Sequence, residues 1–253
     1  SVSLMVDIGD DVISPSRISL AAGFDGSGDV FGVWRGSMSI TRAGTDVTLS
    51  AQDDIYGRSG ISNQFDVLAG SYTNLQLIFN GEEATPGLAP GKQGVPLPVT
   101  AGDTLTATVI AVDEYWNPVP EQPWVHFESD NYFDMISLND VQLEADGSSD
   151  FDMLLRAAAT HTITVTDLSQ PAHLDSSTVI SNPGLWEKMI LVAPGETQVP
   201  GGYEPDGKSG TPDSQVASLQ FPVIARAVDN YWNSVGADGG VINLTASDGS
   251  LDE

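Results

Sequence analysis

The stretch AVDEYWNPVP, Ala111 to Pro120, decides the fold, because AVDNYWNSVG, Ala227 to Gly236, repeats its pattern 116 positions later. Both copies read Ala-Val-Asp-x-Tyr-Trp-Asn, with two bulky aromatic residues between an acid and an amide. Such a repeat is either a binding site present twice or a strand end and corner that a domain needs each time it is built. The rest of the sequence has to distinguish these two interpretations.

The similarity extends well beyond this stretch and gives a period of about 115 residues. The segment after residue 200 is two residues longer than its counterpart, so an insertion lies in the later loop. The matching pairs are APGKQGVP (89–96) with PDGKSGTP (205–212), LQLIFNGEEATPG (75–87) with MILVAPGETQVPG (189–201), and AGTDVTLSAQD (43–53) with AATHTITVTD (158–167).

This period predicts one complete domain with a partial domain on each side. VSLMVD from Val2, VHFESD from Val125 and VINLTASD from Val241 occupy the same point of the repeat, where we expect a strand. Residues 1–70 are then the C-terminal part of one domain, 73–183 a complete domain and 186–253 the N-terminal part of another. Because chain ends rarely fall inside a core strand, we expect a segment of a longer tandem array.

Alternation with a period of two predicts the strands. Leu105, Ala107, Val109 and Ala111 share one face, and Phe221, Val223, Ala225 and Ala227 share it in the next copy. Further strands are expected at 124–129, 148–156, 161–167, 178–181 and 188–192, separated by turn-rich pieces. About seven short strands per repeat, with no helical periodicity, predict an all-β chain of tandem immunoglobulin-like β-sandwiches.

The chain is strongly acidic, with 35 acids against nine bases and a formal net charge of -26 over 253 residues. This charge opposes binding to nucleic acid or anionic lipid, so we expect neither partner. There are no cysteines, which excludes disulfides and thiolate chemistry. No apolar run approaches the length of a membrane span, so membrane insertion is not expected.

The AVDxYWN strand end, the strand near THTITVTD and the PGE…GK.G.P loop resemble bacterial immunoglobulin-like (Big-type) tandem repeat modules of large secreted or surface proteins and adhesins. The resemblance implies an extracellular, cell-surface location and a non-catalytic structural role. Many such modules place Gly before the corner Asn, whereas Trp116 and Trp232 stand there in this chain.

Asp113 with Asn117, and Asp229 with Asn233, allow two interpretations. In the first, the carboxylate accepts backbone hydrogen bonds from the following turn, in which the Asn tolerates left-handed backbone geometry. In the second, Asp113 and Asp229 are weak calcium candidates, because calcium takes about six to eight oxygen ligands. No cofactor or tightly bound metal is expected, since Asn230 replaces the acid found at Glu114.

The aromatic pairs are the next candidates. In Tyr115 with Trp116, and in Tyr231 with Trp232, we expect one ring to cover the domain end and the other to lie at a wet rim or contact a neighbouring domain. The alternative is a sugar-stacking platform that binds a surface glycan, or a contact for a partner protein.

The long loops 80–99 and 194–215 should lie near the junction with the preceding domain, because each follows a first strand. Lys92 and Lys208 within them are candidates to pair with a carboxylate of that neighbour; the alternative is an ordinary solvated lysine.

Catalytic motifs are missing, so no enzymatic activity is expected. His161 alternates with threonines along a strand and is expected to face solvent. The acids between Asp140 and Asp152, and DGSGD at 25–29, are expected to be turns rather than calcium loops.

Three functions are compatible with these features. The first is a stalk, fibre or adhesin shaft made of tandem domains that contact one another. The second is a filament subunit, in which residues 186–253 of one chain and 1–70 of the next complete a sandwich. The third is a carbohydrate- or partner-binding accessory domain that uses Tyr115 and Trp116.

Overall fold

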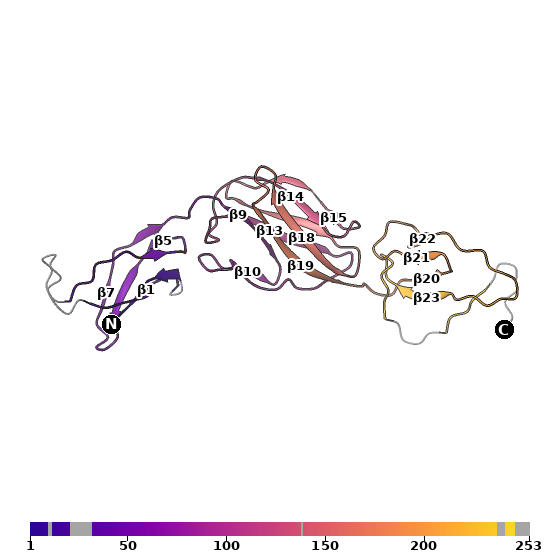
Figure 1. The fold of residues 1–253 in the computed structure, drawn as a ribbon, viewed down its shortest axis with the longest axis horizontal. Helices are drawn as coiled ribbons and strands as arrows, with labels where there is room; N and C mark the ends of the chain where they lie inside the picture. Colours follow the sequence, from indigo (N-terminus) through magenta and orange to yellow (C-terminus); the bar gives the residue numbers. More distant parts are fainter. Residues whose placement is uncertain (10–11, 21–31, 138, 237–240, 246–253) are drawn as a thin grey trace.

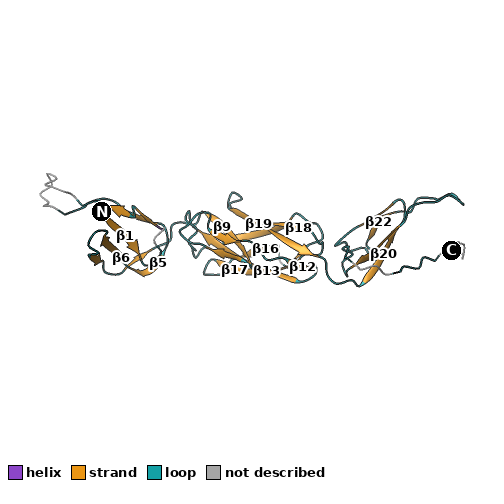
Figure 2. Ribbon diagram, turned by 90° about the horizontal axis from the view of Figure 1, so that it is seen from below, coloured by secondary structure: helices purple, strands orange, loops and turns teal. Residues whose placement is uncertain are grey.

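The computed structural model describes residues 1–9, 12–20, 32–137, 139–236 and 241–245. The strands form three groups in a row along the long axis, in the order of the sequence (Figures 1 and 2). The described part of the chain contains strands and loops but no α-helix, so the chain is all-β as predicted. We call the groups first (β1–β8), middle (β9–β19) and third (β20–β23).

The middle group contains two sheets and a hairpin. One sheet has the order β15-β17-β13-β9 and the other the order β12-β19-β18-β14-β16. The strands of these sheets are β9 (Asn74–Phe79), β12 (Val99–Thr100), β13 (Thr104–Val112), β14 (Trp124–Ser129), β15 (Met135–Ile136), β16 (Asp140–Gln142), β17 (Ser148–Leu154), β18 (Thr160–Asp167) and β19 (Leu174–Asn182). The hairpin pairs β10 (Glu82–Ala84) with β11 (Lys92–Gly94).

The core of the middle group lies between these two sheets, as in a β-sandwich. Leu77 and Val109 from one sheet are fully buried in the same apolar cluster as Val125 and Ile163 from the other. Along β13 the burial alternates, and the face predicted from the sequence is the one that is buried. The apolar residues at every second position therefore determine which face of β13 packs inward.

The first group has a smaller core built from Leu4, Val6, Val12, Ile13 and Val47. Its largest sheet has the order β3-β1-β6-β7, and two further pairs are β2-β4 and β5-β8. The strands are β1 (Val2–Val6), β2 (Ile13–Ser14), β3 (Arg17–Ile18), β4 (Ser39–Ile40), β5 (Gly44–Val47), β6 (Leu49–Asp53), β7 (Ser59–Ile61) and β8 (Phe65–Val67).

The third group consists of two strand pairs, β20 (Lys188–Val192) with β23 (Ile224–Val228) and β21 (Glu196–Gln198) with β22 (Lys208–Gly210). Its buried cluster contains Ile190, Val192 and Val228. Phe221 and Val223, predicted to face a core, are 47% and 39% exposed. The described residues 241–245 form no strand, although one was expected from Val241, and the rest of that segment lies outside the described residues.

No helix in the described residues has the length and apolar character needed to cross a bilayer.

Candidate functional site

The corner after β13 is organised by the Asp113 carboxylate. One oxygen accepts hydrogen bonds from the backbone N–H of Tyr115 (2.8 Å) and Asn117 (3.0 Å). The other accepts from the backbone N–H of Gly70 (2.7 Å) and from the Asn117 side chain (2.9 Å). Burial alone would raise the pKa of Asp113, but these donors outweigh it and hold the pKa below its usual value.

Gly70 lies in the segment that joins the first group to the middle group, so the Asp113 carboxylate ties this linker to the corner. The second corner repeats the arrangement. Asp229 accepts from the backbone N–H of Tyr231 (2.8 Å) and Asn233 (2.9 Å), and from the linker N–H of Gly184 (2.8 Å).

The residue in the left-handed conformation is the tryptophan, not the asparagine. Trp116 has φ +58° and Trp232 has φ +66°, at the position where the resembled modules often have Gly. The expectation for Asn117 and Asn233 was therefore wrong. Each indole lies against a glycine of the long loop in its own group, where a Cβ on Gly91 would come within 2.1 Å of the Trp116 ring.

The Asn117 side chain connects the middle group to the first group. Its Nδ2 donates to the carbonyl oxygen of Thr41 (2.8 Å), and its Oδ1 accepts from the N–H of Ala43 (2.8 Å). The amide thus pairs with a backbone C=O and an N–H two residues later, as a neighbouring strand would. We call this contact, together with the linker bond to Gly70, the first joint.

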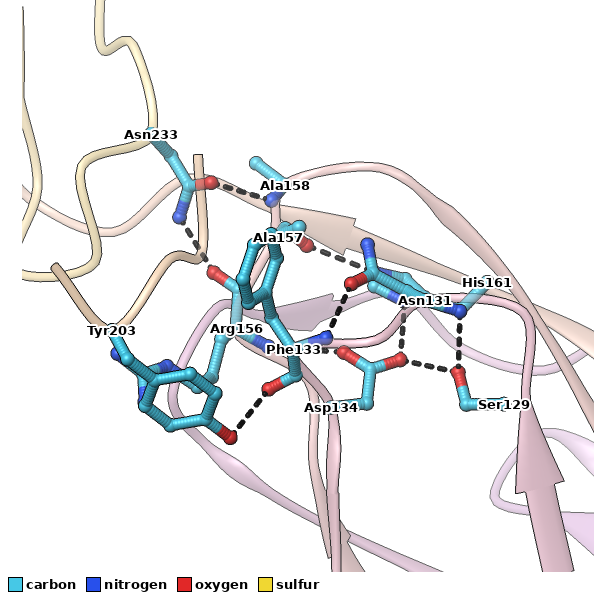
Figure 3. A network of polar contacts seen from close by, with 10 residues as sticks. All are labelled: Ser129, Asn131, Phe133, Asp134, Arg156, Ala157, Ala158, His161, Tyr203 and Asn233. Carbon is cyan, nitrogen blue, oxygen red and sulfur yellow. Dashed lines mark hydrogen bonds and ion pairs between the residues drawn. The ribbon is translucent and has the colours of Figure 1, made fainter. Parts of the chain in front are cut away.

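Asn233 makes the same pair of bonds between the third group and the middle group (Figure 3). Its Nδ2 donates to the carbonyl oxygen of Arg156 (2.8 Å), and its Oδ1 accepts from the N–H of Ala158 (2.7 Å). This contact and the Gly184 linker bond form the second joint. The AVDxYWN corner therefore lies where consecutive groups meet.

The loops before each corner approach the preceding group closely. A Cβ on Gly87 would come within 2.6 Å of Arg42, and one on Gly201 within 2.8 Å of Ala157. Both glycines have positive φ. The N–H groups of these two glycines donate to the carbonyl oxygens of Tyr115 and Tyr231 respectively, at 2.7 Å in each case. The loops are thus held between the corner and the neighbouring group.

The two tyrosines differ in their surroundings. Tyr115 is 45% exposed. Tyr231 is half-buried and lies against Gly102 of the middle group, where a Cβ would come within 2.1 Å of its ring. The structure therefore places Tyr231 in an inter-group contact and leaves nearly half of Tyr115 exposed.

The corners do not suit calcium. Both carboxylate oxygens of Asp113 already accept two short hydrogen bonds each, so a cation would have to displace N–H donors that fix the turn. Throughout the described part of the chain, no group of three or more acidic, His or Cys side chains is arranged to hold a metal ion.

Lys92 and Lys208 each pair with acceptors in their own group. The expectation that they pair with a carboxylate of the neighbouring domain was therefore wrong. The Nζ of Lys92 donates to the carbonyl oxygen of Leu77 (2.9 Å) and lies 3.1 Å from an Asp175 carboxylate oxygen, both in the middle group. The Nζ of Lys208 lies 2.9 Å from a Glu196 carboxylate oxygen across the β21–β22 hairpin. Each lysine therefore fastens a long loop to the sheet of its own group.

His161 is fully buried, so the expectation that it faces solvent was wrong. Its Nδ1 lies 2.7 Å from a carboxylate oxygen of Asp134, and its Nε2 lies 2.8 Å from the carbonyl oxygen of Ala157. The carbonyl oxygen of Ala157 can only accept, so Nε2 carries a proton, and beside an ionised Asp134 carboxylate Nδ1 also donates and the imidazole is charged. This pair lies directly beneath the loop to which Asn233 binds (Figure 3).

The pKa of His161 is set by opposing influences. Burial lowers it, but the hydrogen bonds to Asp134 and Ala157 and the negative charges of Asp134 and Asp130 outweigh burial and raise it. The Asp134 carboxylate also accepts from the Ser129 hydroxyl at 2.5 Å. The charged pair thus supports the main chain at the second joint.

The acidic stretch 140–152 forms strands and a turn. Asp150 and Asp152 on β17 accept from the hydroxyls of Thr108 and Thr106 on β13, at 2.6 and 2.7 Å. Asp146 accepts from Ser148 within the turn (3.0 Å). The DGSGD segment at 25–29 lies outside the described residues.

The chain matches no protein-family model. It also matches no curated protein.

Solved structures give distant similarities. An Escherichia coli adhesin, FdeC, is 19% identical with a TM-score of 0.33 and covers 64% of this chain. Surface layer protein SbsC, domains 1–6, is 14% identical with a TM-score of 0.31 over 93% of this chain. A Parabacteroides merdae β-glucuronidase is 12% identical with a TM-score of 0.33 over 71% of this chain. The matched parts are 48%, 24% and 21% of those chains, and these values assign neither family nor function.

Proposed function

We propose that this chain is a non-catalytic structural segment of a large extracellular bacterial protein, in which tandem immunoglobulin-like domains form a stalk, fibre or adhesin shaft. Residues 1–70, 73–183 and 186–253 would be a partial, a complete and a second partial domain. The repeated joint is the observation that carries this proposal, because the same side chain binds the same backbone positions of the preceding group twice.

Two features of the joint favour a fixed angle between neighbours. Each joint combines a linker N–H, bound to a buried carboxylate, with an amide side chain that pairs with main chain of the preceding group. These bonds are short and lie where the groups approach closely, so rotation about the linker would break several of them at once. A chain built by repeating one such joint gains length with every added domain.

The charge of the chain suits this role. A formal net charge of -26 makes neighbouring copies repel one another, which keeps extended arrays soluble.

The exposed part of Tyr115 is the place where a surface glycan or a partner protein would bind.

Small-angle X-ray scattering of the full chain tests the proposal. We expect the asymmetric pair-distance distribution of a rod, unchanged when the salt concentration is raised. A symmetric distribution typical of a compact globule would refute the structural role. A matched variant with Asn117→Ala and Asn233→Ala should retain its strand content but show a broader distribution of lengths.

A head-to-tail filament is the second candidate, favoured by an apolar surface on the third group. Met189, Leu191 and Phe221 are each more than 40% exposed, as is Ile224 on β23. Strands such as those of the first group would cover this surface if a second chain supplied them. Light scattering over a range of protein concentrations distinguishes the candidates: growing mass indicates a filament, and constant monomer mass indicates a shaft.

A further inference from the structure

The two joints share the Asp, Asn and linker Gly contacts but differ in the loop that approaches the preceding group. In the first joint this loop is Gly87–Gly91, and Leu88 packs against the apolar core of the first group. In the second joint it is Gly201–Gly207, which is two residues longer, and Gly202 takes the place of Leu88.

The longer loop contacts Arg156 of the middle group through both its backbone and a side chain. Nη2 of Arg156 donates to the carbonyl oxygen of Gly202 (2.9 Å). The guanidinium carbon of Arg156 lies 3.9 Å from the centre of the Tyr203 ring, and Figure 3 shows these two side chains together. The same carbon lies 5.1 Å from the Tyr231 ring centre. The cation thus contacts two aromatic rings of the third group, an arrangement that is favourable when partly desolvated.

Tyr203 also reaches past Arg156 to a second loop of the middle group. Its hydroxyl donates to the carbonyl oxygen of Phe133 (3.2 Å), and the two rings lie 6.0 Å apart in an edge-to-face arrangement. Phe133 precedes Asp134, whose carboxylate pairs with His161 beneath the joint. The extra length of the loop is thus used to contact two separate loops of the preceding group.

The first joint contains a different set of residues at these positions. Thr41 lies where Arg156 lies, and its hydroxyl donates to the carbonyl oxygen of Gly87 (2.7 Å). The contact made by Leu88 is apolar, whereas the contact made by Tyr203 requires a cation and a backbone acceptor. Exchanging the loops would place Leu88 against a charged guanidinium and Tyr203 against Thr41.

We infer that the loops Gly87–Gly91 and Gly201–Gly207 are recognition elements, each specific for the group that precedes it. The common Asp and Asn contacts set the angle of the joint, and the loop determines which neighbour fits. The order of domains in the chain is therefore specified by pairwise contacts and not only by covalent sequence. This inference rests on the proposed structural role of the joints.

Distances between spin labels on the full chain test this inference, because the chain contains no native cysteine. Spin labels are placed at exposed positions that correspond in the repeat. The pair at residues 64 and 93 reports the distance across the first joint, and the pair at residues 178 and 209 reports the distance across the second joint. Arg156→Thr and Tyr203→Ala should broaden the distance distribution of the second joint and leave that of the first joint unchanged. Leu88→Gly should broaden the first and leave the second unchanged.

A loop exchange gives the sharper test. Replacing residues 201–206 with the shorter GLAP sequence of 87–90 should broaden the second distribution as much as Tyr203→Ala does. Tyr203→Phe keeps the ring but loses the bond to Phe133, so it should broaden the distribution less. Amide exchange within β9 and β13 verifies that every variant remains folded.

The outcomes separate this inference from the proposed function. If the wild-type chain scatters as a rod but Arg156→Thr, Tyr203→Ala and the loop exchange all leave the second distribution narrow, the recognition role is refuted and the shaft is not. If each variant broadens both joints equally, neighbour-specific recognition is also refuted. A wild-type chain with broad distributions at both joints would refute the rigid shaft itself.

Discussion

Replacing Asn117 with Ala tests the joint most directly. The substitution removes two hydrogen bonds to the first group, at 2.8 Å each, and one to the buried Asp113 carboxylate at 2.9 Å. A neutral hydrogen bond contributes about 0.5–1.5 kcal/mol net, and one to a charged group about 1.5–3 kcal/mol. Only the contact with Asp113 lies within the middle group, so we expect this group to lose about 1.5–3 kcal/mol of unfolding free energy.

Amide hydrogen exchange separates the two consequences of this change. The N–H of Ala43 is bonded to the Asn117 side chain, so its exchange reports opening of the joint. Losing this bond should accelerate exchange at Ala43 by about tenfold, which corresponds to about 1.4 kcal/mol. Amides of β13 report unfolding of the middle group and should lose protection by the larger amount.

The control is Asn182→Ala, which removes an exposed amide on β19 of the same group. It should leave the exchange of Ala43 and of β13 within experimental error, because surface substitutions rarely change stability by more than about 0.5 kcal/mol. If Asn117→Ala behaves like this control at Ala43, the joint does not depend on the Asn side chain and our reasoning fails.

Three further predictions follow from single contacts. Gly91→Ala should destabilise the middle group by about 2 kcal/mol or more in urea titrations, because the residue has φ +90° and its Cβ would collide with Trp116. The control Gly60→Ala should be neutral, because no atom lies within 4 Å of a Cβ at that position. The pKa of His161 is raised in the folded state, so its charged form stabilises the fold fully below about pH 6.5, and this stabilisation is lost as the pH rises through the folded pKa. The free energy of unfolding should therefore fall toward alkaline pH. His161→Gln should flatten that dependence on pH. Lys92→Met should lower the unfolding free energy of the middle group by about 1–3 kcal/mol, because the Leu77 carbonyl and the Asp175 carboxylate lose the ammonium group that donates to them. Amide hydrogen exchange in β9 measures this loss. The third group should not be affected.

The strands could be predicted from sequence because they depend on local pattern. Apolar residues at every second position of β13 match its buried face, and the strands expected at 124–129 and 188–192 begin and end as predicted. The alternation follows from backbone geometry alone, since successive side chains of a strand point to opposite faces. A strand was also expected from Val241, where the described residues 241–245 form none.

The chemistry of the corner was predicted in part. Asp113 does accept hydrogen bonds from the turn that follows it, as its short side chain at a strand end indicates. The left-handed residue is Trp116 and not Asn117. The signal for this was present in the sequence, because Trp116 stands where the resembled modules often have a glycine.

The sequence by itself determined that this chain is all-β and that its AVDxYWN stretch occurs twice, because strand alternation depends on neighbouring residues and the two stretches can be compared directly. Only the tertiary structure decided what the corner binds. Asn117 pairs with backbone 74 and 76 positions earlier in the chain, and backbone groups carry no sequence signature. The burial of His161 was likewise decided by Asp134, 27 positions away, which supplies the charge that a buried imidazolium requires.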